Sequence, residues 1–265
     1  MLGAVIGDIV GSRFEWKNSK SKDFEFFTPD CRITDDSVMT LAVAQAVLNA
    51  GSRQELGAEA VRCMQSFGLR WARGCYGGRF SRWLMSESPR PYGSWGNGSA
   101  MRVSACAWAA ESLEDALDMA RRVTAVTHDH PEGLKGAEAV TSVIWMARNG
   151  ASRADMRRHV EERYYQLDFT LDEIRPGYGF DVSCQGSVPQ AVEAFLESSS
   201  FEDAVRGAIS LGGDSDTIGA MAGSMAEAFY GIPRELREAA LGFLDAELQA
   251  VVRKFEGSYP GCVIL

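Results

Sequence analysis

"DTIGAMAGSMAEAFYG", residues 216–231, decides the fold of this chain. The stretch is rich in Gly and Ala, which predicts a central helix that other helices approach closely on all sides. Helical patterns also fill most of the remaining sequence, whereas alternating strand patterns are nearly absent. No linker divides the chain. We therefore expect an all-α fold that forms a single domain over residues 1–265.

Irregular segments separate the expected helices at three places, 12–33, 74–96 and 174–187, and hold most of the Gly, Pro and aromatic residues outside helices. Long loops inside a compact fold are usually functional. Gly51 is a suitable C-cap for the helix expected over 37–51. The helical patterns cover 37–51, 111–128, 132–150, 153–167, 188–198, 201–213, 216–231 and 234–257.

The composition excludes several classes of protein. The net charge is −9, from 27 basic and 36 acidic residues, whereas a nucleic-acid-binding face must be basic. The apolar start "MLGAVIGDIVGS" has no basic region and contains Asp8, so it does not resemble a signal peptide. No uncharged run approaches the roughly 18 residues of a membrane span. The six cysteines, which include Cys262, form no C-x-x-C pair, so we expect reduced thiols and a cytoplasmic protein.

Two clusters of acids and hydroxyls stand where helices begin, in "RITDDSVMT" (32–40) and "GGDSDTIGA" (212–220). Each is open to a structural interpretation, because Asp, Ser and Thr are favoured N-caps. A cap needs only one side-chain oxygen, however, and adjacent buried carboxylates repel unless a cation compensates them. If the clusters meet, they form an all-oxygen environment suited to Mg²⁺, Mn²⁺ or Ca²⁺ and not to Zn²⁺.

One competing metal motif can be checked in the sequence. Terpene-type synthases bind Mg²⁺ through D-D-x-x-D on a helix, and here Met39 occupies the place of the third acid. This substitution disfavours a helical enzyme that acts on diphosphates by that route.

Five short motifs occur in an order that resembles the ADP-ribosylglycohydrolases, the family that includes the dinitrogenase reductase-activating glycohydrolase. The resemblance implies a compact orthogonal helical bundle with two Mg²⁺ or Mn²⁺ ions at its centre. It also implies hydrolysis that removes ADP-ribose from a modified side chain or a small ADP-ribosyl conjugate. The motifs are "GDIVGSRFE" (7–15), "TDDS" (34–37), "GNGSAMR" (96–102), "TH" (127–128) and "GGDSDT" (212–217).

The resemblance assigns metal ligands within the two acidic clusters. The bond to be cleaved joins C1″ of the distal ribose to nitrogen or oxygen, and its cleavage develops oxocarbenium character. Metal ions that bind the ribose hydroxyls would fix the ring and lower the pKa of a nearby water. The implied ligands are Thr34, Asp35, Asp36, Asp214, Asp216 and Thr217.

Glu15, Asp36 and Asp214 are the expected catalytic residues. An acid in an N-terminal loop is ordinarily a solvated surface group, but in one branch of the resembled family the glutamate at the place of Glu15 acts in catalysis or gates the metal site. Asp8 is expected to cap or buttress the core. In the nitrogenase-regulating branch a catalytic aspartate precedes the Gly-rich turn, whereas here Glu87 is the only acid in 76–95. Glu15 is therefore the first choice as acid/base partner.

The expected substrate contacts each have a structural alternative. The turn 96–99 either simply starts a helix or offers free N–H groups to an anion. His128 is either an ordinary loop histidine or a hydrogen-bonding group near the distal ribose. Tyr178 either stacks on adenine or anchors its loop. The resemblance favours the binding role for Asn97, Gly98, Ser99, Met101 and His128, and Tyr178 joins this set with both roles open.

The leading function is a metal-dependent hydrolase that releases ADP-ribose from an acceptor, with arginine first because the acidic chain suits a cationic group. Serine-linked ADP-ribose, O-acetyl-ADP-ribose and a nucleic-acid base are the other acceptors. The alternative from another class is a non-catalytic protein that binds divalent metal or ADP-ribose. Such a protein should have lost metal ligands, and here all six positions are filled by suitable residues.

Overall fold

The computed structural model describes residues 1–260, and within them it contains fourteen α-helices, one 3-10 helix and no strand. The all-α prediction is therefore confirmed. The helices are α1 (Leu2–Gly11), α2 (Asp35–Asn49), α3 (Leu56–Gly68), α4 (Gly78–Leu84), η1 (Asn97–Ser99), α5 (Ser104–Ala109), α6 (Leu113–Ala125), α7 (Pro131–Arg148), α8 (Arg153–Arg163), α9 (Leu171–Ile174), α10 (Cys184–Leu196), α11 (Phe201–Ile209), α12 (Ser215–Tyr230), α13 (Arg234–Leu241) and α14 (Ala246–Ser258).

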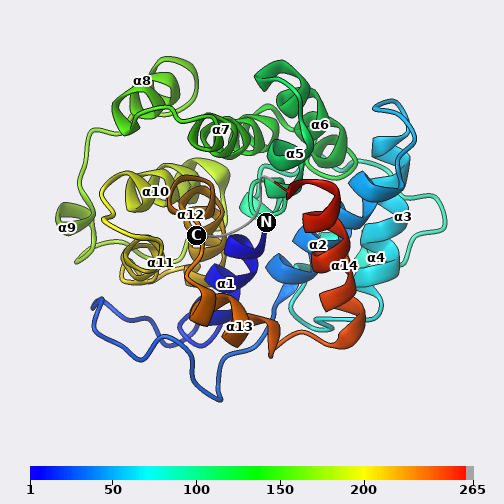
Figure 1. Ribbon diagram of the computed structural model, residues 1–265. Helices are drawn as coiled ribbons and strands as arrows, with labels where there is room; N and C mark the ends of the chain where they lie inside the picture. The colour runs from blue at the N-terminus through cyan, green and yellow to red at the C-terminus, as the bar shows by residue number, and fades with distance from the viewer. Residues whose placement is uncertain (261–265) are drawn as a thin grey trace.

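Helices α1 and α12 form the centre of the molecule (Figure 1). All of α1 is buried, and α12 is buried from Ser215 to Glu227, as expected for the Gly- and Ala-rich stretch. The two backbones approach so closely that a methyl group on Gly7 would overlap the carbonyl of Gly219. Glycine is required at this crossing because any side chain would separate the two helices that carry the site.

The outer helices cover this pair on two sides. Helices α7, α10 and α11 lie on one side of it, and α2, α3 and α14 lie on the other (Figure 1). α6 shows why such helices form, because Ala116, Met119, Ala120 and Val123 recur at helical spacing and are all buried. Burial of such apolar stripes stabilises the bundle.

The helix boundaries depart from the sequence predictions in several places. Residues 234–257 were expected as one helix, but the chain breaks after Leu241 and restarts at Ala246. Asp245 causes the restart, because its side chain accepts from the N–H groups of Glu247 and Leu248 and so caps α14. Helices α1, α3 and α4 were not among the predicted segments.

The structure also describes the state of the cysteines and the apolar character of the helices. Five cysteines, Cys31, Cys63, Cys75, Cys106 and Cys184, are free. The sixth, Cys262, lies outside the described residues. Within residues 1–260, no helix combines the length and the apolar character needed to cross a membrane.

Candidate active site

The two acidic clusters, whose contact between Asp36 and Thr217 spans 181 residues of sequence, meet at one point of the fold. Carboxylate oxygens of Asp8, Asp36 and Asp216 lie within 4.8 Å of one another. The Thr217 hydroxyl donates to Asp36 Oδ2 at 3.2 Å, which joins the start of α12 directly to the start of α2. The expectation that the clusters converge is confirmed.

A tight turn aims the second cluster at this point. Gly212 and Gly213 have φ values of 70° and 69°, a region that side chains disfavour. The side chain of Asn18 holds the turn, because its Oδ1 accepts from Gly213 N at 2.8 Å. The irregular segment 12–33 thus packs against the turn and positions Asp214 and Asp216.

Asp8 holds the first cluster in place. Its Oδ2 accepts from the backbone N–H groups of Thr34 at 2.9 Å and Ser37 at 3.0 Å, and its Oδ1 accepts from Thr34 Oγ1 at 2.6 Å. The Ser37 hydroxyl also donates to Asp8. These bonds use both oxygens of Asp8 and fit the expected buttressing role. Thr34 caps α2, since its side chain accepts from Asp36 N.

The acids of the site have no cationic partners. None of the ion pairs among residues 1–260 involves Asp8, Glu15 or an aspartate of either cluster. Burial, followed by the charges of neighbouring acids, raises the pKa of Asp36 and Asp216 well above the ordinary value and that of Asp35 to about 8. Burial is also the main cause of the raised pKa of Asp214, while Asn97 opposes it through a hydrogen bond.

The oxygens of this cluster suit divalent cations. Asp36 Oδ1 is buried and has no hydrogen-bond partner, although buried polar atoms are normally paired. Asp216 belongs to two groups of closely spaced carboxylates, one with Asp8 and Asp36 and one with Glu15 and Asp214. An all-oxygen set of this kind matches hard cations such as Mg²⁺ and Mn²⁺.

A cavity of about 520 Å³ opens onto the cluster. Its acids are Glu15, Asp35, Asp36, Asp214 and Asp216, and its cations are Arg79 and Arg102. The wall also contains His128 and the expected contacts Asn97, Gly98, Met101 and Thr217, together with Trp16, Met39, Cys75, Tyr76, Gly77, Gly78, Phe80, Tyr92, Ser94, Gly96, Phe180 and Val182.

Glu15 lines the cavity and is half-buried. Burial, followed by the charge of Asp214, raises the pKa of Glu15, while Arg32 opposes the shift. Glu87, the other acid weighed for this role, is exposed and is not among the residues that line the cavity. The geometry therefore brings Glu15, and not Glu87, to the acidic cluster.

The Gly-rich turn serves the cluster as well as the cavity. Asn97 Nδ2 donates to Asp214 Oδ2 at 2.7 Å, so the turn positions the second cluster. The Ser99 hydroxyl donates to Gly96 O at 2.9 Å and contacts Cys184 Sγ, and Ser99 is absent from the cavity wall. The side chain of Ser99 thus stabilises the turn from within the protein.

Tyr178 lies where its anchoring alternative predicts. Its hydroxyl donates to Gly186 O at 2.7 Å, and its ring packs against the core outside the cavity wall. Phe180, two residues later, lines the cavity instead and stacks on Trp16 with ring centroids 5.5 Å apart. This geometry favours the anchoring role of Tyr178, and Phe180 is the aromatic residue of this loop that reaches the cavity.

Several wall residues were not identified from the sequence. Trp16, Arg79 and Phe180 reach the cavity from separate segments, and no local pattern marks them, whereas Arg102 ends the motif 96–102 without a role assigned to it.

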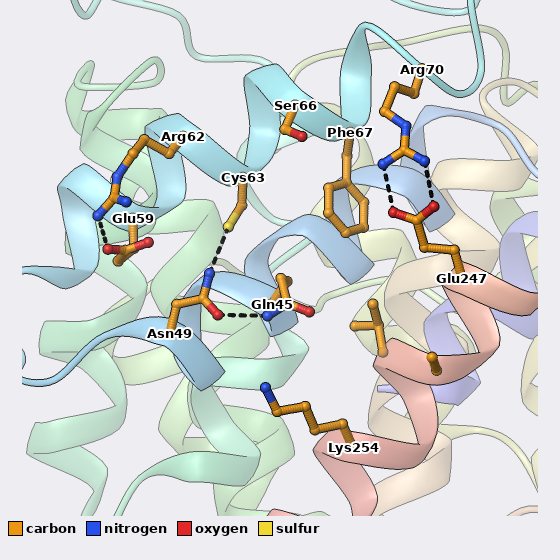
Figure 2. Close-up of a pocket in the computed structure, with 12 residues that line it drawn as sticks. Gln45, Asn49, Glu59, Arg62, Cys63, Ser66, Phe67, Arg70, Glu247 and Lys254 are labelled. Carbon is orange, nitrogen blue, oxygen red and sulfur yellow. Dashed lines mark hydrogen bonds and ion pairs between the residues drawn. The ribbon is translucent and has the colours of Figure 1, made fainter.

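A second hollow of about 460 Å³ lies between α2, α3 and α14, away from the acidic cluster (Figure 2). Its charged groups are largely matched, because Arg62 pairs with Glu59 and Arg70 pairs with Glu247. Asn49 links Gln45 to Cys63 through hydrogen bonds of 2.6 and 3.7 Å. This hollow has no unpaired acid cluster and is not the candidate site.

Comparisons with known proteins agree with this geometry. The family model described as ADP-ribosylglycohydrolase matches residues 1–261. ADP-ribosylhydrolase ARH3 of Mus musculus is 27% identical, over 97% of this chain and 91% of its own length, and the Homo sapiens protein is 26% identical over 97% and 93%. ADP-ribosyl-(dinitrogen reductase) glycohydrolase of Rhodospirillum rubrum is 24% identical over 96% and 91%. A solved "ADP-ribosylglycohydrolase-related protein complex" shares the fold, with a TM-score of 0.67, 24% identity and coverage of 99% and 96%.

Proposed function

This chain belongs to the ADP-ribosylglycohydrolase family and is an ADP-ribosylglycohydrolase, and we propose that it removes ADP-ribose from arginine side chains in a metal-dependent reaction. The observation that carries the metal dependence is the convergence of unpaired carboxylates around Asp36, whose buried Oδ1 has no partner. An ADP-ribosylated protein is the proposed partner. The contacts of the site come from segments between Asp8 and Thr217, so we also propose that the chain acts as one domain.

Six residues would hold two Mg²⁺ ions, with Mn²⁺ as the alternative metal. The membership of Asp216 in both carboxylate groups supports two adjacent ions rather than one. When bound, such ions supply charge neutralisation and Lewis-acid stabilisation of substrate oxygens. The proposed ligands are Thr34, Asp35, Asp36, Asp214, Asp216 and Thr217.

Glu15 is the proposed acid/base residue. Its raised pKa, caused by burial and by Asp214, keeps a larger protonated fraction near neutral pH than an exposed glutamate has. A protonated Glu15 would donate to the departing guanidine nitrogen, and the resulting carboxylate would accept a proton from the attacking water. Asp36 and Asp214 would orient the reacting ribose, because they line the cavity from opposite clusters.

The remaining wall would bind the rest of ADP-ribose. Gly98, Met101 and His128 face the cavity, and we propose that they contact the substrate. Asn97 would act both on the substrate and on Asp214, whereas the hydrogen bond of Ser99 supports a role in shaping the turn. The bond of Tyr178 to Gly186 favours anchoring of the loop that carries Phe180.

An arginine acceptor agrees with the charge of the site. The departing guanidinium group is cationic, and five carboxylates line the cavity. Two divalent ions would offset four of these charges, and the wall also contains the cations Arg79 and Arg102, so the attraction for a cationic acceptor comes mainly from the chain as a whole. The net charge of −9 for the whole chain acts in the same direction.

The test is release of free ADP-ribose from arginine-linked, serine-linked and O-acetyl donors, each with Mg²⁺, with Mn²⁺ and with a chelator. We expect release from the arginine-linked donor and only with metal. Release only from the serine-linked or acetyl donor would replace the acceptor and keep the hydrolase. Equal release in the chelator would overturn the metal dependence.

A further inference from the structure

Arg102 is a buried cation without an acidic partner. Its side chain is 1% exposed, and neither its hydrogen bonds nor the charges that act on it include a carboxylate. Isolated buried charges are costly and usually paired, so this residue requires an explanation. The shortest hydrogen bond of its guanidinium runs from Nη2 to Thr127 Oγ1, at 2.7 Å.

Thr127 passes this hydrogen bond on to His128. Thr127 is fully buried, and its Oγ1 lies 2.7 Å from Nδ1 of His128. A guanidinium group only donates hydrogen bonds, so the Thr127 oxygen accepts from Arg102 and its own proton must find another acceptor. The nearest acceptor is Nδ1 of His128, because the alternative, the carbonyl of Thr124, is 3.4 Å away.

This order of donors sets the protonation of the imidazole. When Nδ1 accepts, the ring proton of a neutral histidine sits on Nε2. Burial, followed by the charges of Arg102 and Arg79, lowers the pKa of His128 well below the ordinary value, so the ring is neutral at pH 7. Nε2 faces the Gly-rich turn, 3.4 Å from where a Cβ on Gly98 would lie, and His128 lines the cavity.

We propose that Arg102 and Thr127 are positioning residues that fix His128 as the Nε2–H tautomer, so that it donates a hydrogen bond to an oxygen of bound ADP-ribose. The inference rests on the proposed function, because it names the ligand of the same cavity. The opposite tautomer would turn a bare nitrogen lone pair toward a ligand rich in oxygen acceptors, which repels it. The charge of Arg102 also favours an anionic ligand in this half of the cavity.

The tautomer is measurable because the chain has three histidines, at 128, 130 and 159. Nitrogen-15 NMR of the imidazole rings distinguishes Nδ1–H from Nε2–H, and His128→Gln assigns the signals of interest. We compare the unaltered protein with Thr127→Val, which removes the hydroxyl, and Thr127→Ser, which restores it. Thr124→Val is the matched control, because Thr124 is also buried, near the end of α6, but its hydroxyl has no partner.

We expect Nε2–H on His128 in the unaltered protein, in Thr127→Ser and in Thr124→Val, and a mixture of tautomers in Thr127→Val. Calorimetry should show ADP-ribose affinity about tenfold weaker for Thr127→Val, and within twofold of the unaltered protein for the other two. Nδ1–H in the unaltered protein, or weaker binding by Thr127→Val with an unchanged tautomer, overturns the inference. Failure of the unaltered protein to release ADP-ribose from any donor would instead overturn the proposed function, since the tautomer is read in the free protein.

Discussion

The cavity at the acidic cluster and the hollow of Figure 2 are of similar size but differ in how their charges are arranged. In the hollow, Arg62 and Arg70 each meet a glutamate across a short distance. In the cavity, no acid forms an ion pair, and Oδ1 of Asp36 has no hydrogen-bond partner. The two cations of the cavity wall, Arg79 and Arg102, likewise bind no carboxylate.

The difference separates groups that complete their interactions within the protein from groups that await a ligand. Paired surface charges contribute little to stability and need no further partner. Buried carboxylates without cations instead have raised pKa values, first through burial and then through one another's charges, and they destabilise the folded state when they are charged. Under the proposed function, bound cations and substrate would supply the missing partners.

The largest expected effect comes from removing one charge of the cluster. Asp36→Asn or Asp214→Asn should lower kcat/KM for ADP-ribose release by about 10³-fold or more, because each change removes a proposed metal ligand. In a chelator at pH 8 the melting temperature of each variant should equal or exceed that of the unaltered protein, because the substitution relieves repulsion. Full turnover by a folded double variant with no bound metal would contradict the assignment.

Glu15→Gln tests the proposed acid/base group. We expect kcat to fall about 10²-fold with little change in ADP-ribose affinity, because the amide cannot exchange a proton. The residual activity should also lose the part of its pH dependence that arises from the titration of Glu15. A profile of unchanged shape would assign the proton transfer to another group. Glu87→Gln is the matched control and should leave kcat unchanged, because Glu87 is exposed and does not line the cavity.

The pH dependence of stability tests the unpaired carboxylates as a set. Their pKa values are higher in the folded than in the unfolded protein, so the folded state binds more protons between these values. The free energy of unfolding in a chelator should therefore fall as pH rises from about 4 to about 8, the folded-state pKa of Asp35. We expect a melting temperature roughly 5–10 °C lower at pH 8 than at pH 5.5.

Bound metal should restore the melting temperature that is lost at pH 8 and should change it little at pH 5.5, because coordination needs deprotonated carboxylates. Calorimetric scans with Mn²⁺, with Mg²⁺ and with chelator at both pH values measure this effect on the melting temperature. Stability that rises with pH in the chelator would show that the acids are already compensated within the protein.

The smallest effect is expected in the paired hollow. Glu247→Gln removes the partner of Arg70, and both side chains are about half exposed, so the change should cost less than about 1 kcal/mol. Activity and metal affinity should not change. A tenfold loss of activity would show that the hollow communicates with the cavity and would break the contrast drawn between them.

Much of the fold was predictable from local pattern. The helices α6, α8 and α11 lie within their predicted segments, and α7 and α12 begin one residue before theirs, because apolar spacing and N-caps are properties of neighbouring residues. The single helix expected over 234–257 was wrong, because the capping by Asp245 interrupts a continuous apolar pattern. Helix α1 was not predicted as such, and its burial on every face reflects the packing of α12.

The site divides in the same way. The motifs identified the two acidic clusters, Glu15 and the Gly-rich turn, all of which reach the cavity. They did not reveal that Asn97 holds Asp214, that Ser99 points inward, or that Phe180 replaces Tyr178 at the wall. These facts depend on side-chain direction, which neighbouring residues alone do not specify.

The sequence by itself determined that this is a helical protein with two oxygen-rich corners and the motifs of a glycohydrolase family. Those properties follow from residue spacing and residue chemistry, which act over a few positions along the chain. Only the tertiary structure decided that Asp36 meets Thr217 and that Arg102 reaches His128 through Thr127. The physical reason is that these contacts join segments far apart along the chain, so they depend on how the helices pack and on which groups burial leaves without partners.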